Sequence, residues 1–213
     1  MSVAQFTRVL LVDDHSVVRE GYRRLLEGEP GITVVGEAAD AARACEYALA
    51  LAPDVVVMDI GLPGVSGIDA MRRMLAHRPG LRVLMFSMHD DAIFCSRALQ
   101  AGALGYLSKS SAPETLVRAV HAVARGEQYL SPDLARTLAH TSSPERRAAL
   151  EALTAREFEV LRLLARGETL ARIAEKLGVS EKTVANHQSA VRDKLGIRNG
   201  VQLARLAERL GVC

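Results

Sequence analysis

The chain has 213 residues and a formal net charge of +2, so its overall charge singles out no class of partner. It is long enough for one or two domains with a sizeable core. The charge is unevenly divided: residues 1–130 carry 13 Lys and Arg against 15 Asp and Glu, whereas residues 141–213 carry 13 against nine. This asymmetry indicates an anionic partner for the C-terminal part.

Three further features argue against a secreted or membrane-spanning protein. The N-terminal stretch reaches two acidic residues after a few apolar positions, unlike a signal peptide. No apolar run approaches the length of a membrane span. The three cysteines are far apart and show no spacing typical of a metal site. We therefore expect a cytoplasmic protein with reduced thiols and no membrane partner.

The first 125 residues alternate short apolar runs with segments of helical periodicity. The predicted strands are residues 8–13, 32–38, 54–59, 82–87 and 105–108. The predicted helices are residues 16–26, 40–51, 67–77, 91–101 and 112–124. Ser111 and Glu114 are spaced as a capping box for the last helix. This alternation predicts βαβ units, and therefore an α/β fold with a doubly wound parallel sheet.

Polar residues stand at the carboxyl ends of the predicted strands. Asp13 and Asp14 follow the first strand, Asp59 and Ser87 end the third and fourth, and Lys109 follows the fifth. A lone Asp after a strand is usually a helix cap or a turn residue. Three Asp, one Ser and one Lys at one sheet edge indicate a site instead. Clustered carboxylates need a cation, and oxygen ligands suit Mg2+. With Mg2+ bound, a carboxylate can act as a nucleophile toward a phosphoryl group.

Lys109 stands out in a chain that otherwise uses arginine. The sequence has 23 Arg and four Lys, and Lys109 is the single Lys among the first 175 residues. Arg and Lys are not interchangeable, so a compact ammonium at this position indicates a specific role. Lys109 and the metal would share the charge of a transferred phosphoryl group, and Ser87 could donate a hydrogen bond to it.

These residues, together with "DIGLPGVSG" and "GALGYLSK", resemble the receiver domain of two-component response regulators over residues 7–125. The resemblance implies a flavodoxin-like (βα)5 domain in which Asp59 accepts a phosphoryl group from a sensor histidine kinase. It further implies that Mg2+ is held by Asp13 or Asp14, by Asp59 and by the backbone carbonyl of Gly61. Ser87 and Lys109 would sense the phosphoryl group, and Tyr106 would be the switch aromatic that turns inward when Ser87 moves.

The remaining residues change to helical patterns alone. Residues 129–149 are predicted to form a short helix, capped by Ser131, followed by a polar linker. Four helical segments then follow within residues 153–167, 169–178, 179–196 and 199–211, the first with a capping box of Thr154 and Glu157. This pattern predicts a small all-α domain of four helices.

The third of these segments is amphipathic. At 100° per residue, Val184, Gln188, Val191 and Leu195 fall on one face, which we expect to be inside. The opposite face carries Lys182, Asn186, Ser189 and Asp193, with Ala185 and Arg192 on one flank. A helix, a glycine-centred turn and a second helix with a polar outer face are typical of major-groove readers, although ordinary helical hairpins also have solvated faces.

The C-terminal string from 150 to 212 resembles the LuxR-type helix-turn-helix of the NarL/FixJ family of regulators. The resemblance implies that 180–195 is a recognition helix. It further implies that Lys182, Thr183 and Arg192 contact DNA phosphates, and that Ala185, Asn186 and Ser189 face base edges. Many relatives have Lys at the position of Ala185, which indicates a different sequence preference here. The last helix would either pack on its own domain or also pair two DNA-binding domains.

The sequence thus predicts a receiver domain over 1–128, a short helix and linker over 129–149, and a DNA-binding domain over 150–213. Phosphorylation would control homodimerisation and binding to double-stranded promoter DNA, with RNA polymerase as a further candidate partner. We expect no enzyme activity beyond self-catalysed phosphoryl transfer and slow autodephosphorylation. Two alternatives stay open: a receiver controlled by protein contact alone, and a Mg2+-dependent aspartyl phosphotransferase. The complete metal, Ser and Lys set argues against the first, and the lack of a substrate-binding cap argues against the second.

Overall fold

The computed structural model describes residues 6–88, 92–131, 134–136, 138, 152–197, 199, 202–203 and 205–206. The chain forms two compact units, Met1–His140 and Thr141–Cys213. The predicted linker residues 141–149 lie outside the described residues. Among the described helices, none has both the length and the apolar character needed to cross a membrane.

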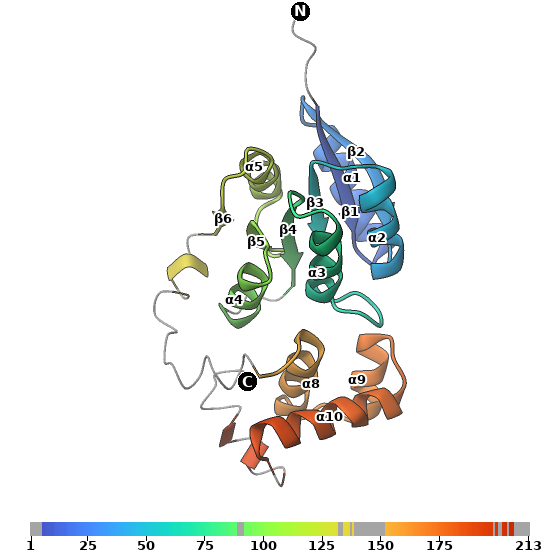
Figure 1. Ribbon diagram of the computed structural model, residues 1–213, viewed down its shortest axis with the longest axis vertical. Coiled ribbons are helices and arrows are strands. Elements are labelled where there is room, and N and C mark those ends of the chain that lie inside the picture. Colours follow the sequence, from blue (N-terminus) through green and yellow to red (C-terminus); the bar gives the residue numbers. More distant parts are fainter. Residues whose placement is uncertain are drawn as a thin grey trace, which may run out of the picture. The chain divides into compact units, whose positions relative to one another are not determined.

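The first unit is built on a parallel six-stranded sheet (Figure 1). Its strands are β1 (Thr7–Val12), β2 (Ile32–Ala38), β3 (Val55–Met58), β4 (Arg82–Ser87), β5 (Gly105–Ser108) and β6 (Tyr129–Leu130). They are arranged in the order β2-β1-β3-β4-β5-β6, and every pairing is parallel. The predicted parallel α/β sheet is confirmed, and its order reverses between β1 and β3, where such sheets bind their ligands.

Strand β6 was not predicted, because residues 129–130 were assigned to the segment that precedes the second domain. Tyr129 pairs with Gly105, and the Tyr129 N–H donates to the Leu104 carbonyl at 3.1 Å. Two residues are too few for an alternating pattern to show in a sequence. The pairing therefore depends on the exposed edge of β5.

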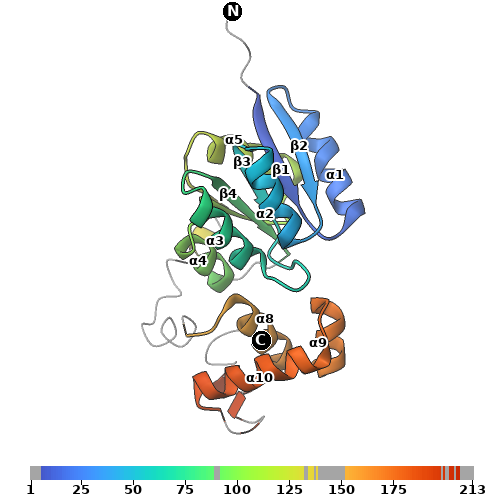
Figure 2. The ribbon, with the colours of Figure 1, turned by 45° about the vertical axis from the view of Figure 1, so that its right-hand side comes forward.

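Helices cover both faces of this sheet (Figure 2). They are α1 (Ser16–Glu27), α2 (Ala41–Ala50), α3 (Gly67–His77), α4 (Ala92–Gln100) and α5 (Pro113–Ala124). On one face, Leu26 of α1 and Leu116 and Val120 of α5 pack against strand residues that include Val57 and Phe86. The opposite face carries α2, α3 and α4 (Figures 1 and 2). This double covering explains why the strands are apolar throughout.

The predicted capping box at the start of α5 is wrong. The helix begins at Pro113, and its N-cap is Ala112, whose side chain makes no capping hydrogen bond. A proline disfavours helical backbone in the residue before it, so Ala112 is extended, at ψ 142°, and Ser111 lies one position too early to cap. The proline thus overrides the spacing of Ser111 and Glu114.

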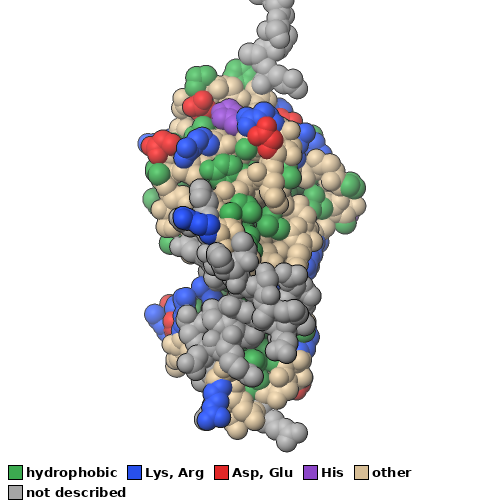
Figure 3. Space-filling model, turned by 90° about the vertical axis from the view of Figure 1, so that its left-hand side faces the viewer, with side chains coloured by type: hydrophobic (Ala, Val, Ile, Leu, Met, Phe, Trp, Pro, Cys, Tyr) green, Lys and Arg blue, Asp and Glu red, His purple; other side chains and the backbone are tan. Residues whose placement is uncertain are grey.

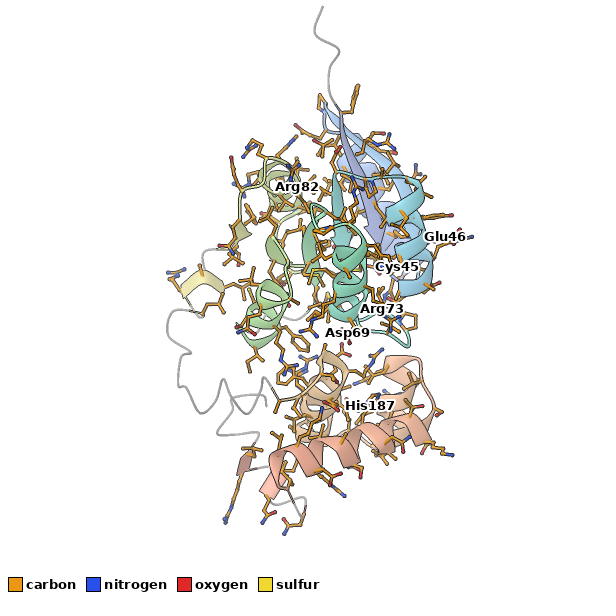
Figure 4. All side chains as sticks on the ribbon, in the orientation of Figure 1. Cys45, Glu46, Asp69, Arg73, Arg82 and His187 are labelled. Atoms are coloured by element: carbon orange, nitrogen blue, oxygen red, sulfur yellow. The ribbon has the colours of Figure 1, made fainter. Side chains whose placement is uncertain are left out.

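Side chains between the elements hold the sheet and helices together. Arg82, at the start of β4, donates from Nη1 to the Ala124 carbonyl at 2.7 Å and ties the strand to the end of α5 (Figure 4). Cys45 on α2 faces α3, with its Sγ 3.9 Å from the Ala70 oxygen (Figure 4). On the face shown in Figure 3, acidic and basic side chains are interspersed around a histidine, so opposite charges compensate one another there.

The second unit contains α8 (Ala155–Ala165), α9 (Leu170–Leu177) and α10 (Glu181–Leu195). Their apolar faces meet in a core formed by Val160, Leu163, Ile173, Ala174, Leu177 and Val184. The predicted Thr154–Glu157 capping box is present at the start of α8. Of the fourth predicted helix, residues 202–203 and 205–206 are helical, and most of the remainder lies outside the described residues.

Candidate functional site

The sheet register brings the predicted strand-end residues to one edge. Val12 of β1 pairs with Met58 of β3, so Asp13 and Asp59 are the next residues on adjacent strands. The Asp59 N–H donates to the Val12 carbonyl at 2.9 Å. On the other side of β3, the Lys109 N–H donates to the Ser87 carbonyl at 2.8 Å, which joins the ends of β4 and β5. The carboxyl ends of four strands therefore supply the site.

The Lys109 side chain bridges two carboxylates at this edge. Its Nζ lies 2.5 Å from Asp13 Oδ2 and 2.7 Å from Asp59 Oδ2. These side chains are buried, with 6% of Lys109, 7% of Asp13 and 9% of Asp59 exposed. The Ser87 and Tyr106 residues are also buried. The structure thus joins Lys109 to two of the three predicted carboxylates.

In this cluster, burial and the charge of the ion-pair partner shift the pKa values of Asp59 and Lys109 in opposite directions. Burial raises the pKa of Asp59, and the negative charge of Asp13 adds to this, while Lys109 opposes it. Burial works to lower the pKa of Lys109, but Asp59 and Asp13 outweigh it, so the net shift is upward. The Lys109 ammonium is therefore stabilised in its charged form, whereas burial disfavours the ionised form of the Asp59 carboxylate.

Asp14 differs from the other two carboxylates because it is exposed. Its Oδ1 lies 2.7 Å from His15 Nδ1, which is also 3.4 Å from Asp13 Oδ1. One ligand atom from each of these three residues lies within 4.8 Å of the other two. Near Asp59, the Gly61 N–H donates to Asp59 Oδ1 at 3.3 Å, so Gly61 adjoins the carboxylate. A role for the Gly61 carbonyl stays a prediction.

The donor set fits a hard divalent cation. Three carboxylates carry three negative charges, and Lys109 compensates one of them, which leaves two for a divalent ion to neutralise. The oxygen atoms of Asp13, Asp14 and Asp59 are the donors that Mg2+ prefers. One of the three carboxylates is exposed, so the site is open to solvent on that side.

Gly67 is a residue of the site that the sequence analysis did not single out. A Cβ on Gly67 would lie 1.8 Å from the Asp59 carbonyl oxygen and 2.8 Å from its carbonyl carbon. The Gly67 N–H also donates to the Ile60 carbonyl at 2.9 Å. The first residue of α3 therefore packs directly on the backbone that carries Asp59, and only glycine leaves room. The sequence shows three glycines after Asp59, but no local pattern in it points to this close approach.

Helix α10 has the buried and exposed faces that were predicted. Val184 and Val191 are fully buried, whereas Lys182, Asn186 and Ser189 are exposed. The other three predicted contact residues, Thr183, Ala185 and Arg192, are half-buried. Gly178, with φ of 60°, ends α9 in a left-handed turn, and Ser180 caps α10 through the Thr183 N–H at 3.1 Å. Helix, tight turn and polar-faced helix thus follow one another as in a helix-turn-helix.

A buried carboxylate fixes α10 against α8. Glu157 Oε2 accepts from the Thr154 N–H at 2.6 Å and from Lys194 Nζ at 2.7 Å. Burial works to raise the pKa of Glu157, but these donors outweigh it and lower the pKa below its ordinary value. His187 lies on α10 (Figure 4). Burial lowers its pKa, and the positive charge of Arg156 lowers it further. His187 therefore favours its neutral form, which suits packing.

Two family models match this chain. The response regulator receiver domain matches residues 9–121, and the luxR family of bacterial regulatory proteins matches residues 151–207. The chain therefore belongs to the two-component response regulators that combine a receiver domain with a LuxR-type DNA-binding domain, which confirms the predicted family. It is a transcriptional regulator.

Individual relatives agree with this assignment. The response regulator UvrY of Escherichia coli O6:H1 is 38% identical over 207 residues, which cover 96% of this chain and 95% of UvrY. A LuxR-family two-component response regulator from Aurantimonas sp. is 47% identical, with a TM-score of 0.62, over 64% of this chain and 97% of that one. The structure of an RcsB–DNA complex is 28% identical, with a TM-score of 0.62, over 96% of this chain and 98% of RcsB.

Proposed function

We propose that Asp59 is the phosphoacceptor of this regulator and that its phosphorylation controls dimerisation and binding to promoter DNA. The observation that carries the proposal is the Lys109 ammonium, held 2.5 Å from Asp13 and 2.7 Å from Asp59 at the sheet edge. The phosphoryl donor is a phosphohistidine of a sensor kinase. The protein acts in the cytoplasm and turns over no substrate other than its own phosphoryl group.

The chemistry follows from the groups around Asp59. A carboxylate oxygen of Asp59 attacks phosphorus, the O–P bond forms as the P–N bond breaks, and the released imidazole takes up a proton. Lys109 places its positive charge where the phosphoryl oxygens arrive, and the Ser87 hydroxyl donates a hydrogen bond to one of them. Mg2+, held by Asp13, Asp14, Asp59 and the Gly61 carbonyl, supplies further charge neutralisation when bound.

The signal leaves the site through β4 and β5. Ser87 ends β4, and Tyr106 pairs with Met85 two residues earlier on that strand. A displacement of Ser87 toward the phosphoryl group changes the packing around the buried Tyr106 ring. This change shifts the equilibrium between two conformations of the receiver. The receiver includes strand β6, so the connection to the DNA-binding domain at 150–213 begins after Leu130.

The DNA-binding domain reads its site with α10. Lys182, Thr183 and Arg192 contact phosphates, whereas Ala185, Asn186 and Ser189 face base edges. An asparagine can bond adenine with both of its amide atoms, and an alanine can contact a thymine methyl group. In a homodimer, two such helices contact half-sites about one helical turn apart.

Intact-mass spectrometry tests the phosphoacceptor assignment. The full chain, Asp59→Asn and the control Asp69→Asn are incubated with acetyl phosphate and Mg2+. Asp69 is on α3 and pairs with Arg72 on the protein surface, so its substitution leaves the site intact. We expect a gain of one phosphate in the wild type and in Asp69→Asn, and none in Asp59→Asn. Sedimentation of the same samples should show dimers only where the mass has increased.

Other outcomes would identify a different control. A phosphate gain in Asp59→Asn would place the phosphoacceptor elsewhere. No gain in any of the three proteins would reject the proposal and leave a receiver that responds to protein contact alone. Steady turnover of a small phosphate ester by the wild type would instead make the chain an aspartyl phosphotransferase.

A further inference from the structure

Arg19 connects the candidate metal site to the edge strand β2. From the first turns of α1, its Nη1 donates to the Asp13 carbonyl oxygen at 2.6 Å. Its Nε donates to Glu37 Oε2 on β2 at 2.9 Å. The Arg19 side chain is only 16% exposed, so this guanidinium is held between two acceptors in a largely dry position. Nothing in the proposed chemistry uses it.

The Arg19 contact completes the support of the Asp13 backbone. The Asp13 N–H donates to the Ala38 carbonyl at 3.1 Å, and Ala38 directly follows Glu37 on β2. Both peptide groups that flank Asp13 are therefore fastened to the end of β2, one directly and one through Arg19. The second of these groups is the peptide bond between Asp13 and Asp14. Because a peptide group is planar, fixing its carbonyl fixes the direction in which Asp14 leaves the strand.

Asp14 is the carboxylate that most needs this support. Asp13 is held by Lys109 and by the His15 N–H, at 2.5 and 2.9 Å. Asp14 is exposed, and among the described residues its ion-pair partner is His15. Its position toward a metal therefore depends on its backbone. Groups that orient metal ligands in this way typically alter metal affinity without touching the metal.

We propose that Arg19, anchored by Glu37, is a positioning residue that holds the Asp13–Asp14 peptide in the orientation required to bind Mg2+. This inference rests on the metal site of the proposed function and adds to it two residues that do not touch the ion. It makes a prediction opposite in sign to simple electrostatics. Removing a positive charge beside a cation site should strengthen Mg2+ binding, whereas removing a positioning residue should weaken it.

Arg23 offers a matched control on the same helix. It lies one turn after Arg19 and also pairs with Glu37, its Nε being 3.3 Å from Oε1. It forms further pairs with Glu20 and Glu27, but its described contacts do not include Asp13. Arg19→Gln and Arg23→Gln therefore remove the same charge and a contact with the same glutamate. They differ in the hydrogen bond to the Asp13 carbonyl.

The first measurement is Mg2+ titration of the full-length variants by calorimetry, after thermal unfolding in EDTA has shown that each is folded. We expect Arg19→Gln to raise the Kd for Mg2+ about tenfold, and Arg23→Gln to leave it unchanged. An unchanged or lower Kd in Arg19→Gln overturns the inference, as does an equal increase in both variants. If the wild type binds no Mg2+, the proposed function fails together with the inference.

Phosphorylation by acetyl phosphate at varied Mg2+ supplies an independent readout. In Arg19→Gln, the half-saturating Mg2+ concentration should rise while the rate at saturating Mg2+ is retained. A fall of the saturated rate without a change in half-saturation would overturn the positioning role. Glu37→Gln should shift half-saturation in the same direction, which tests the anchor if Arg19→Gln does not fold. Arg19→Lys should be intermediate, because an ammonium lacks the planar fork that reaches both acceptors.

Discussion

Most of the polar residues of the receiver site are buried, whereas those on the outer face of α10 are exposed. At the sheet edge, Asp13, Asp59 and Lys109 are buried together, and each depends on its partners for compensation. On α10, Lys182 and Asn186 are exposed to solvent. Removing one member of the buried group leaves uncompensated charge, whereas removing an exposed side chain leaves nothing unsatisfied. We therefore expect substitutions in the buried receiver site to alter stability, and substitutions of the exposed residues Lys182 and Asn186 on α10 to alter DNA binding alone.

The largest difference in the free energy of unfolding should appear between substitutions of two lysines, Lys109 and Lys182. In EDTA, Lys109→Ala should lower the free energy of unfolding by about 4 kcal/mol, because it leaves two buried carboxylates without their cation. Lys182→Ala should change it by less than about 0.5 kcal/mol. Urea denaturation measures both, and added Mg2+ should restore part of the loss in Lys109→Ala. Equal effects of the two substitutions would contradict the comparison.

Two glycines extend the comparison to the backbone. Gly67→Ala places a methyl group against the Asp59 carbonyl and should cost about 3 kcal/mol, with slower phosphorylation because Asp59 is displaced. Gly21 lies within α1, and a Cβ there would have no neighbour within 4 Å. Gly21→Ala should instead stabilise the protein by about 0.5–1 kcal/mol. Denaturation of the two variants against the wild type decides this, and a neutral Gly67→Ala would refute the close packing.

On α10 the expected losses are in DNA affinity. A binding site is first selected from random duplexes, and fluorescence anisotropy is then measured over a range of salt. Asn186→Ala should cost about 2 kcal/mol on the selected site and little on unrelated duplexes. Lys182→Ala should weaken both alike and reduce the salt slope by about 1. If Asn186→Ala weakens all duplexes equally, Asn186 does not contact a base.

The smallest effect concerns pH. Since the pKa of Asp59 is raised in the folded protein, the folded state binds this proton more tightly than the unfolded state. The corresponding stability is present at acidic pH and is lost as pH rises through the folded pKa. In EDTA, Asp59→Asn should therefore be more stable than the wild type at pH 7, and the gap should narrow toward acid. Thermal unfolding across pH measures this gap, and a gap that widens toward acid would contradict the prediction.

Much of the fold was predictable because its signals are local. Apolar runs of strand length alternate with helical periodicity, and the observed β2, β4 and β5 have the predicted bounds. A parallel sheet brings its strand ends together, so the residues after those strands could be placed at one edge before their contacts were known. The inside and outside faces of α10 followed from the helical repeat in the same way.

The remaining features arise from contacts between distant segments. Neither Gly67 nor Arg19 carries a local pattern that points to the backbone atoms it contacts, because those contacts depend on how α3 and α1 pack on the sheet. Strand β6 depends in the same way on the free edge of β5. Periodicity and strand-end chemistry thus sufficed to predict the two domains and to place Asp13, Asp59, Ser87 and Lys109 at one sheet edge. The contacts of Gly67 and Arg19 with the backbone of Asp59 and Asp13 emerged only from tertiary packing, because backbone carbonyls are alike in every sequence and are distinguished only by position.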